Sequence, residues 1–313
     1  MTPRYSRRTF MGLLGGGAIA TGFAFSAGRP LTRSAVALTF ISGTPESLPV
    51  AEKPLLRIEN TGGFVPVEYM LTAIPTFSMF ADGRVITTGP MIEIFPQPAL
   101  PNLRVMTLNE KGIARVLGVA KSAGLFDGSA DYELPNIADA QSTVFTLNAD
   151  GVSTEVSAYA LGFDDSIGMD IPNAEARKKL NELRDFLFNL QTELTAEEIT
   201  KADESYLSDE IRIFAAPIDP ASPPWQDVIE EPASIAWPLG VGLAEIGAPF
   251  TGPFSEGTRC TTITGADVER LYKVLSGANQ LTPWESEGEL YQIWVRPLLP
   301  DESGCDSPEP ATA

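Results

Sequence analysis

The chain has 313 residues, 43% of them hydrophobic and 20% charged, a composition typical of a globular protein with a substantial core. Its formal net charge of −19 disfavours nucleic acid and anionic membrane surfaces as partners, because both repel an acidic protein. The sequence contains no histidine, which excludes Ser-His-Asp and Cys-His catalysis and every metal site built on imidazole. Any chemistry therefore relies on carboxylates, Lys, Tyr, Ser, Thr or cations held by oxygen ligands.

Residues 1–37 are expected to be a targeting segment and not part of the fold. Arg7, Arg8 and Phe10 precede an uncharged, glycine-rich apolar run over residues 12–28. This arrangement resembles the twin-arginine (Tat) export signal, in which two arginines, a variable residue and a phenylalanine follow one another. The resemblance implies export of the folded chain by the Tat route to the periplasm, the cell envelope or the medium. The alternatives are an ordinary secretory signal or an uncleaved anchor, which would be the only attachment to a membrane.

The next 16 residues, 38–53, show no clear periodicity and are expected to be an extended lead-in. A first domain is expected over residues 54–191. Its first strand covers 54–59, where apolar residues alternate, and another strand is expected over 104–107. Between them, the proline-rich stretch 90–101 should be an extended surface connection.

Two hairpins are predicted in this first domain, each with an Ala-Asp-Gly turn between alternating runs. One joins residues 76–80 to 84–88, and the other joins 143–148 to 153–158. A helix follows each hairpin. Thr107 and Glu110 have the spacing of a capping box for the first helix, and the second helix should begin at Asn173 after a proline.

An acidic segment without an apolar stripe, residues 192–208, is expected to link this domain to a second one over 209–305. Strands are predicted over 210–215, 258–264 and 289–297, and Thr264 should cap a helix after the second of these. Residues 306–313 form a polar tail. Hairpins joined to helices predict an α+β fold with two domains, each an antiparallel sheet with helices packed on one face.

The two cysteines, Cys260 and Cys305, are expected to form a disulfide, because the chain is expected in an oxidising compartment. The bridge would close a loop of about 45 residues, which the chain-entropy model values at about 4 kcal/mol. Because a Tat-exported core must form before this bond does, we expect the bridge to pin the C-terminal tail and not to nucleate the fold.

Near this tail, residues 278–284 and 295–302 resemble the ending of uncharacterised exported bacterial proteins. That resemblance implies export but no activity.

The densest acidic loop contains Asp164, Asp165 and Asp170. Oxygen ligands at alternate positions suit a hard cation such as Ca²⁺, although the glycine lies one position earlier than in an EF-hand loop and Pro172 occupies the ninth position. The competing interpretation is a solvated loop that leads into a helix. No other cofactor is expected.

The four tryptophans all lie in the last third of the chain, and Trp225, Trp237 and Trp284 are each next to a proline. If exposed, these three would provide a surface for a protein partner or a glycan. The alternative is that they pack in the core beneath their loops.

The sequence leaves two functions open. The first is a non-enzymatic exported binding or assembly protein of the cell envelope, which contacts an envelope protein or glycan through these tryptophans. The second is a histidine-free hydrolase that cleaves envelope polysaccharide with two carboxylates. For that second function, the best candidates are Glu285, Glu287 and Glu289, next to Trp284.

Overall fold

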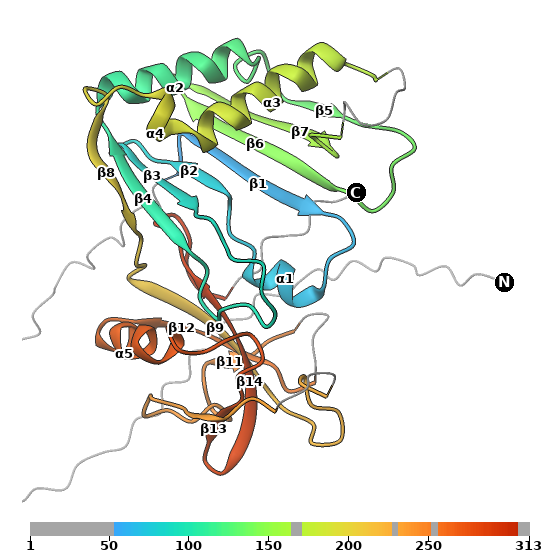
Figure 1. Cartoon of the computed structure of the whole chain (residues 1–313), viewed down its shortest axis with the longest axis vertical. Coiled ribbons are helices and arrows are strands. Elements are labelled where there is room, and N and C mark those ends of the chain that lie inside the picture. The colour runs from blue at the N-terminus through green and yellow to red at the C-terminus, as the bar shows by residue number, and fades with distance from the viewer. Residues whose placement is uncertain (1–52, 164–170, 227–230, 252–255, 306–313) are drawn as a thin grey trace, which may run out of the picture. The chain divides into compact units, whose positions relative to one another are not determined.

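The structure, a computed structural model, describes residues 53–163, 171–226, 231–251 and 256–305. The export motif with Arg7, Arg8 and Phe10 lies outside these residues, as does the acidic loop with Asp164, Asp165 and Asp170. The described chain has two sheets, of eight and six strands, with a few helices (Figure 1). The predicted α+β class is confirmed.

The first sheet has the strand order β5-β7-β6-β1-β2-β3-β4-β8. Its pairs are antiparallel apart from β5 and β7, which are parallel. Its strands are β1 (Leu56–Gly62), β2 (Phe77–Met79), β3 (Arg84–Thr88), β4 (Leu103–Leu108), β5 (Ala130–Tyr132), β6 (Gln141–Ala149), β7 (Val152–Tyr159) and β8 (Ile199–Ser205).

Both predicted hairpins are present in this sheet, as β2–β3 and β6–β7. In the first turn Gly83 has φ +87°, and a Cβ atom there would lie 2.2 Å from the carbonyl oxygen of Leu108. The turn therefore requires glycine, because any side chain would collide with β4.

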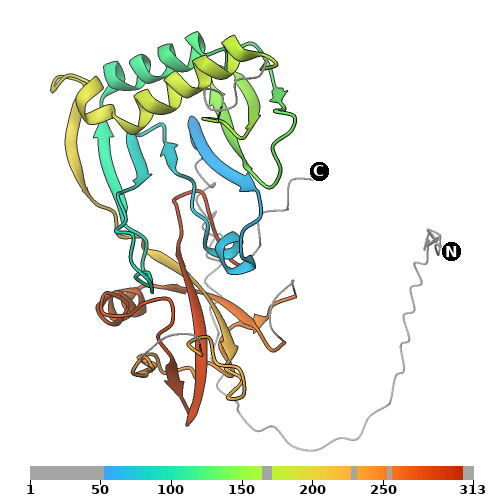
Figure 2. The same cartoon turned by 45° about the vertical axis from the view of Figure 1, so that its right-hand side comes forward.

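The helices α2 (Glu110–Ser122), α3 (Ala174–Phe188) and α4 (Leu190–Glu193) lie over one face of this sheet (Figures 1 and 2). Their buried residues recur at helical spacing and pack against the strand residues that point to the same face. This core includes Leu56, Ile58, Phe77, Phe145, Val116, Ala120, Leu180, Leu183 and Leu187. The helix α2 is capped by Asn109, whose side-chain oxygen accepts from the N–H groups of Lys111 and Gly112, and not by Thr107, the predicted cap.

The second sheet has the order β10-β13-β14-β9-β12-β11. Its strands are β9 (Glu210–Pro217), β10 (Ile235–Ala236), β11 (Ala248–Pro249), β12 (Arg259–Thr264), β13 (Trp284–Ser286) and β14 (Glu289–Pro297). The helix α5 (Ala266–Leu275) packs its buried side chains Val268, Leu271 and Leu275 against β9 and β14. It begins after Gly265 and not after Thr264, the predicted cap.

The segment 192–208, expected to be a linker, contains the edge strand β8. The segment lacks an apolar stripe because an edge strand pairs on one side only and carries charged residues that discourage further pairing. Arg104 on β4 binds Asp203 on β8 at 2.6 Å and also donates to Ser205. The chain passes from the first sheet to the second between Ser205 and Glu210, close to the predicted boundary.

The C-terminal tail connects the two sheets. The predicted disulfide is confirmed: Cys305 bonds to Cys260 on β12, with the two Cα atoms 5.9 Å apart. Arg212 on β9 donates to the carbonyl of Gly304 at 2.6 Å, and Arg57 on β1 pairs with Asp301 at 2.7 Å. These contacts hold both sheets in one compact unit. Among the described residues, no helix is long and apolar enough to cross a membrane.

Candidate functional site

The antiparallel order of β1, β2 and β3 brings two connections to the same end of the first sheet. Residues 63–76 join β1 to β2, and residues 89–102 join β3 to β4. The N–H of Thr88 donates to the carbonyl of Thr76 at 3.3 Å, which places the two connections next to each other where they leave the sheet. Both views show them at the end of the first sheet nearest to β9 and β14 (Figures 1 and 2). We call these two connections the apolar end.

The apolar end exposes an unusual share of large apolar side chains. Twelve such side chains are exposed among the described residues, and seven of them belong to these two connections. They are Phe64, Tyr69, Met70, Met91, Ile92, Ile94 and Phe95. Scattered exposed apolar residues are normal on a protein surface, whereas a concentration of them marks an interaction site.

The first connection contains the short helix α1 (Val67–Thr72). Leu71 is buried against Phe214 of the second sheet, and Arg296 on β14 donates to the carbonyl of Ala73 at 2.8 Å. Because these contacts fix the inner side of α1, Tyr69 is left facing solvent on the outer side. Phe64, just before the helix, is 90% exposed.

The second connection concentrates its apolar residues further, with four of them in the five residues from Met91 to Phe95. Phe95 is the most exposed of the four, at 68%. The base of the connection is closed by Asn102: its carbonyl accepts from Gly89 at 2.6 Å, and its side-chain amide donates to the carbonyl of Pro90 at 2.8 Å.

The tip of this connection is held by Gln97. Its side-chain amide donates to the carbonyls of Ile92 and Ile94, at 3.1 and 2.7 Å. Gln97 therefore satisfies backbone groups that a mobile loop would leave to water. The apolar side chains are thus exposed on a backbone that these hydrogen bonds hold.

The far side of the same connection is anchored on the second sheet. The N–H of Ala99 donates to the carbonyl of Ala278 at 3.0 Å, and Gln280 donates to the carbonyl of Gln97 at 2.8 Å. Ala99 and Leu100 pack against the core beneath α5. The connection is thus supported from both sheets, and its large apolar side chains at Met91–Phe95 are open to solvent.

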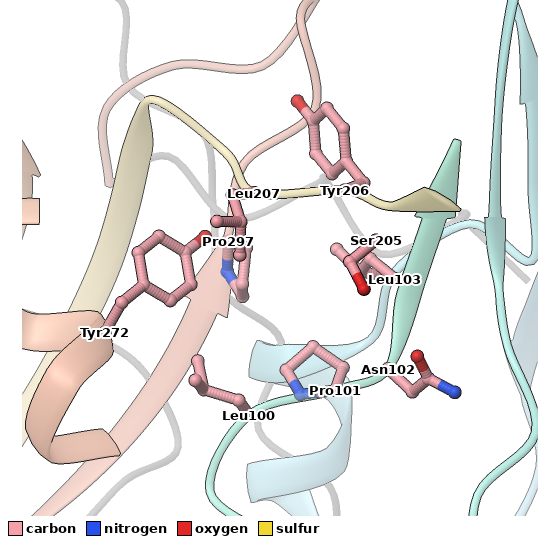
Figure 3. A pocket seen from close by; sticks show the side chains of 9 residues that line it. All are labelled: Leu100, Pro101, Asn102, Leu103, Ser205, Tyr206, Leu207, Tyr272 and Pro297. Atoms are coloured by element: carbon pink, nitrogen blue, oxygen red, sulfur yellow. The ribbon is translucent and has the colours of Figure 1, made fainter. Parts of the chain in front are cut away.

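A cavity of about 140 Å³ lies at the end of this connection (Figure 3). Its lining residues are Leu100, Pro101, Asn102, Leu103, Ser205, Tyr206, Leu207, Tyr272 and Pro297. The Tyr272 hydroxyl accepts from the N–H of Ser208 at 3.0 Å, and burial raises the pKa of this phenol to about 12. Ligand pockets usually measure 300–1,000 Å³, so this cavity is the size of one side chain and not of a substrate. Leu207, which is exposed, lies among its lining residues.

The three tryptophans expected to form a binding surface are buried: Trp225, Trp237 and Trp284 are 8%, 9% and 1% exposed. Trp237 and Trp284 meet edge to face at 5.9 Å within the core of the second sheet. The Trp237 indole N–H donates to the carbonyl of Val241, which satisfies its one polar atom. This burial removes the expected aromatic surface.

The carboxylates suggested for hydrolysis lie on one hairpin. Glu285, Glu287 and Glu289 are exposed on the β13–β14 hairpin. On β1, burial raises the pKa of the Glu59 carboxyl, the neighbouring Arg57 lowers it, and Glu155 and Glu302 raise it further. In the part of the chain that the structure describes, no three His, Cys, Asp or Glu residues are grouped closely enough to hold a metal ion.

Sequence reasoning missed the apolar end, although a signal was present. The stretch Met91–Phe95 is apolar at four of five positions and is flanked by prolines, a composition that neither a strand nor a solvated loop explains. Comparison with protein-family models, with curated proteins and with solved structures finds no match to this chain. The function must therefore be argued from the site itself.

Proposed function

We propose that this chain is a non-enzymatic exported protein of the cell envelope that binds a partner protein through the apolar end. The observation that carries the proposal is the exposure of four large apolar side chains within Met91–Phe95, on a backbone held by Gln97 and Asn102. The binding residues that we propose are therefore Ile92, Ile94 and Phe95, with Tyr69 from the neighbouring connection.

The energetics favour this role. Burial of a fully exposed Ile, Met or Phe side chain is worth about 1.5–3 kcal/mol, and these four side chains are 46–68% exposed, so roughly half of that gain per residue is left unused by folding. An ordered loop has already lost most of its conformational entropy, and a partner that covers it does not have to restrain it again. Aromatic and methionine side chains are also enriched at the centres of protein interfaces.

Two features support export. The Cys260–Cys305 disulfide is of the kind that persists in oxidising compartments. The N-terminal resemblance to a twin-arginine signal supplies a route, and it leaves residues 1–37 as the only segment that we propose to enter a membrane. The acidic net charge of −19 supports a protein partner over nucleic acid.

The test is site-specific photo-cross-linking in cells of the native host. A photoreactive amino acid is placed at Ile92 or Tyr69, and at Lys178 on α3 as an exposed control. We expect protein adducts of one mass from both Ile92 and Tyr69 and none from Lys178. Adducts that are equal at all three positions, that contain lipid only, or that do not form at the apolar end would refute the proposal.

The alternative, a histidine-free hydrolase of envelope polysaccharide, has one observation in its favour. Glu59 has a raised pKa beside Glu155 and Glu302, and a general acid in such a hydrolase needs a raised pKa. Release of reducing ends from purified envelope polysaccharide by the exported form, and its loss in Glu59→Gln, would support this function. No release by the wild-type protein would exclude it.

A further inference from the structure

The apolar end carries charge of one sign only. Its two connections contain Glu68 and Glu93 and no Lys or Arg. Both glutamates are exposed, and neither forms an ion pair with a described residue. Other acids of the chain are paired, for example Asp203 with Arg104 and Asp301 with Arg57.

The position of Glu93 restricts what can cover this surface. Glu93 lies between Ile92 and Ile94, so a partner that buries both isoleucines also approaches the carboxylate. Partial removal of this carboxylate from water without a counter-charge is unfavourable and offsets part of the gain from the two apolar side chains. A partner that supplies a cationic group next to its apolar contact is therefore favoured.

We infer that the partner is a basic protein whose apolar groove is bordered by Lys or Arg side chains. This inference rests on the proposed function and specifies the chemistry of the partner. The groove takes up Ile92, Ile94 and Phe95, and the basic border pairs with Glu93 and Glu68. The net charge of −19 attracts such a partner over longer distances and speeds association at low salt.

A lipid surface fits these observations less well. Anionic headgroups repel both glutamates as well as the protein as a whole. A zwitterionic surface offers cationic headgroup nitrogens, but each is accompanied by a phosphate that repels Glu93, so its net attraction for the carboxylate is weak. A protein groove with fixed basic side chains satisfies the apolar and the charged requirement together.

The experiment measures binding of the exported form to two fluorescent amphipathic helical peptides by anisotropy. Both peptides have the same leucine face, and the polar face is lysine in one and glutamate in the other. We expect the Leu/Lys peptide to bind at least tenfold more tightly. Exposed ion pairs are worth about 0.2–1 kcal/mol, so Glu93→Gln should weaken binding of the Leu/Lys peptide by about threefold and reduce its salt dependence. The matched control Glu182→Gln on α3 removes the same charge far from the site and should leave binding unchanged.

The variant Ile92→Ser distinguishes failure of the inferred basic partner from failure of the apolar end as a binding surface. If both peptides bind equally and Ile92→Ser weakens both, the basic partner is refuted while the apolar end remains a binding surface. If the Leu/Lys preference persists unchanged in Ile92→Ser and Glu93→Gln, binding reflects net charge alone and both proposals fail. Absence of binding to either peptide also overturns the inference, as does Ile92-dependent binding to phosphatidylglycerol vesicles.

Discussion

Removal of the Cys260–Cys305 disulfide should lower stability by an amount that the structure allows us to calculate. The bridge spans 45 residues of sequence. The chain-entropy model assigns a loop of that length about 4 kcal/mol, because the cross-link restricts the unfolded chain and not the folded one. For a protein of this size, 1 kcal/mol shifts the melting temperature by roughly 2–4 °C, so the Cys260→Ser/Cys305→Ser variant should melt about 8–16 °C lower.

The variant should nevertheless fold with its tail in place. Leu298 and Leu299 are 1% and 2% exposed, so the start of the tail is anchored in the core. Arg212 holds the carbonyl of Gly304 at 2.6 Å, and Asp301 remains paired with Arg57. The native circular dichroism spectrum should therefore be unchanged at 25 °C.

The assay is thermal and urea unfolding of the oxidised wild type, the reduced wild type and the double-serine variant. The reduced wild type is the matched control and should melt with the variant. An unchanged melting temperature would show that the bridge does not restrict the unfolded chain. A variant that fails to fold would show that the bridge is needed to build the core and does not merely pin the tail.

Three further changes test other parts of the structure. Phe95→Ser should change the free energy of unfolding by less than about 0.5 kcal/mol, because the Phe95 side chain is 68% exposed. Phe80→Ala empties a fully buried position and should lower the free energy of unfolding by about 3–5 kcal/mol, measured by urea unfolding. Glu302→Gln removes the negative charge and one of the two carboxylate oxygens that accept from the buried Arg296 at 2.7 and 2.6 Å, and should cost about 3 kcal/mol, while Glu182→Gln costs little. Burial raises the pKa of Tyr272 to about 12 in the folded state, whereas the phenol ionises near pH 10 in the unfolded chain. The contribution of Tyr272 to the free energy of unfolding is therefore fully present below pH 10 and is lost between pH 10 and pH 12. The melting temperature of Tyr272→Phe should therefore fall less over that range than that of the wild type, and equal falls would contradict the assignment.

The sequence predicted the regular parts of the fold because their signals are local. The Asp-Gly turns of both hairpins and the apolar stripes of α2, α3 and α5 depend on residues within one element. By contrast, β8 is stabilised by pairing with β4, about a hundred residues earlier, and its own seven residues show no alternation. In β14 the polar residues Gln292 and Arg296 are also buried, because Arg296 donates to the carbonyl of Ala73 and pairs with Glu302, and Gln292 donates to the carbonyl of Gln280.

The site was less predictable than the fold because exposure is a property of the whole structure. The tryptophans beside prolines and the apolar residues between prolines carry the same sequence signal, a large apolar side chain in an irregular segment. Trp284 is buried because the second core has room for its ring beside Trp237. Phe95 is exposed because Gln97 holds the adjacent backbone and the connection anchors on the second sheet through Ala99. No local pattern distinguishes the two cases.

The strand order of the first sheet also determines when this protein can fold during synthesis. The strand β1 pairs with β6, and β4 pairs with β8. These two pairs can form only after residues 141–149 and 199–205 have left the ribosome. Until then β1–β4 form a small meander that lacks its neighbours on both sides, with unpaired strand edges open to other nascent chains. These edges stay unpaired until β6 and β8 have been synthesised and can pair with β1 and β4.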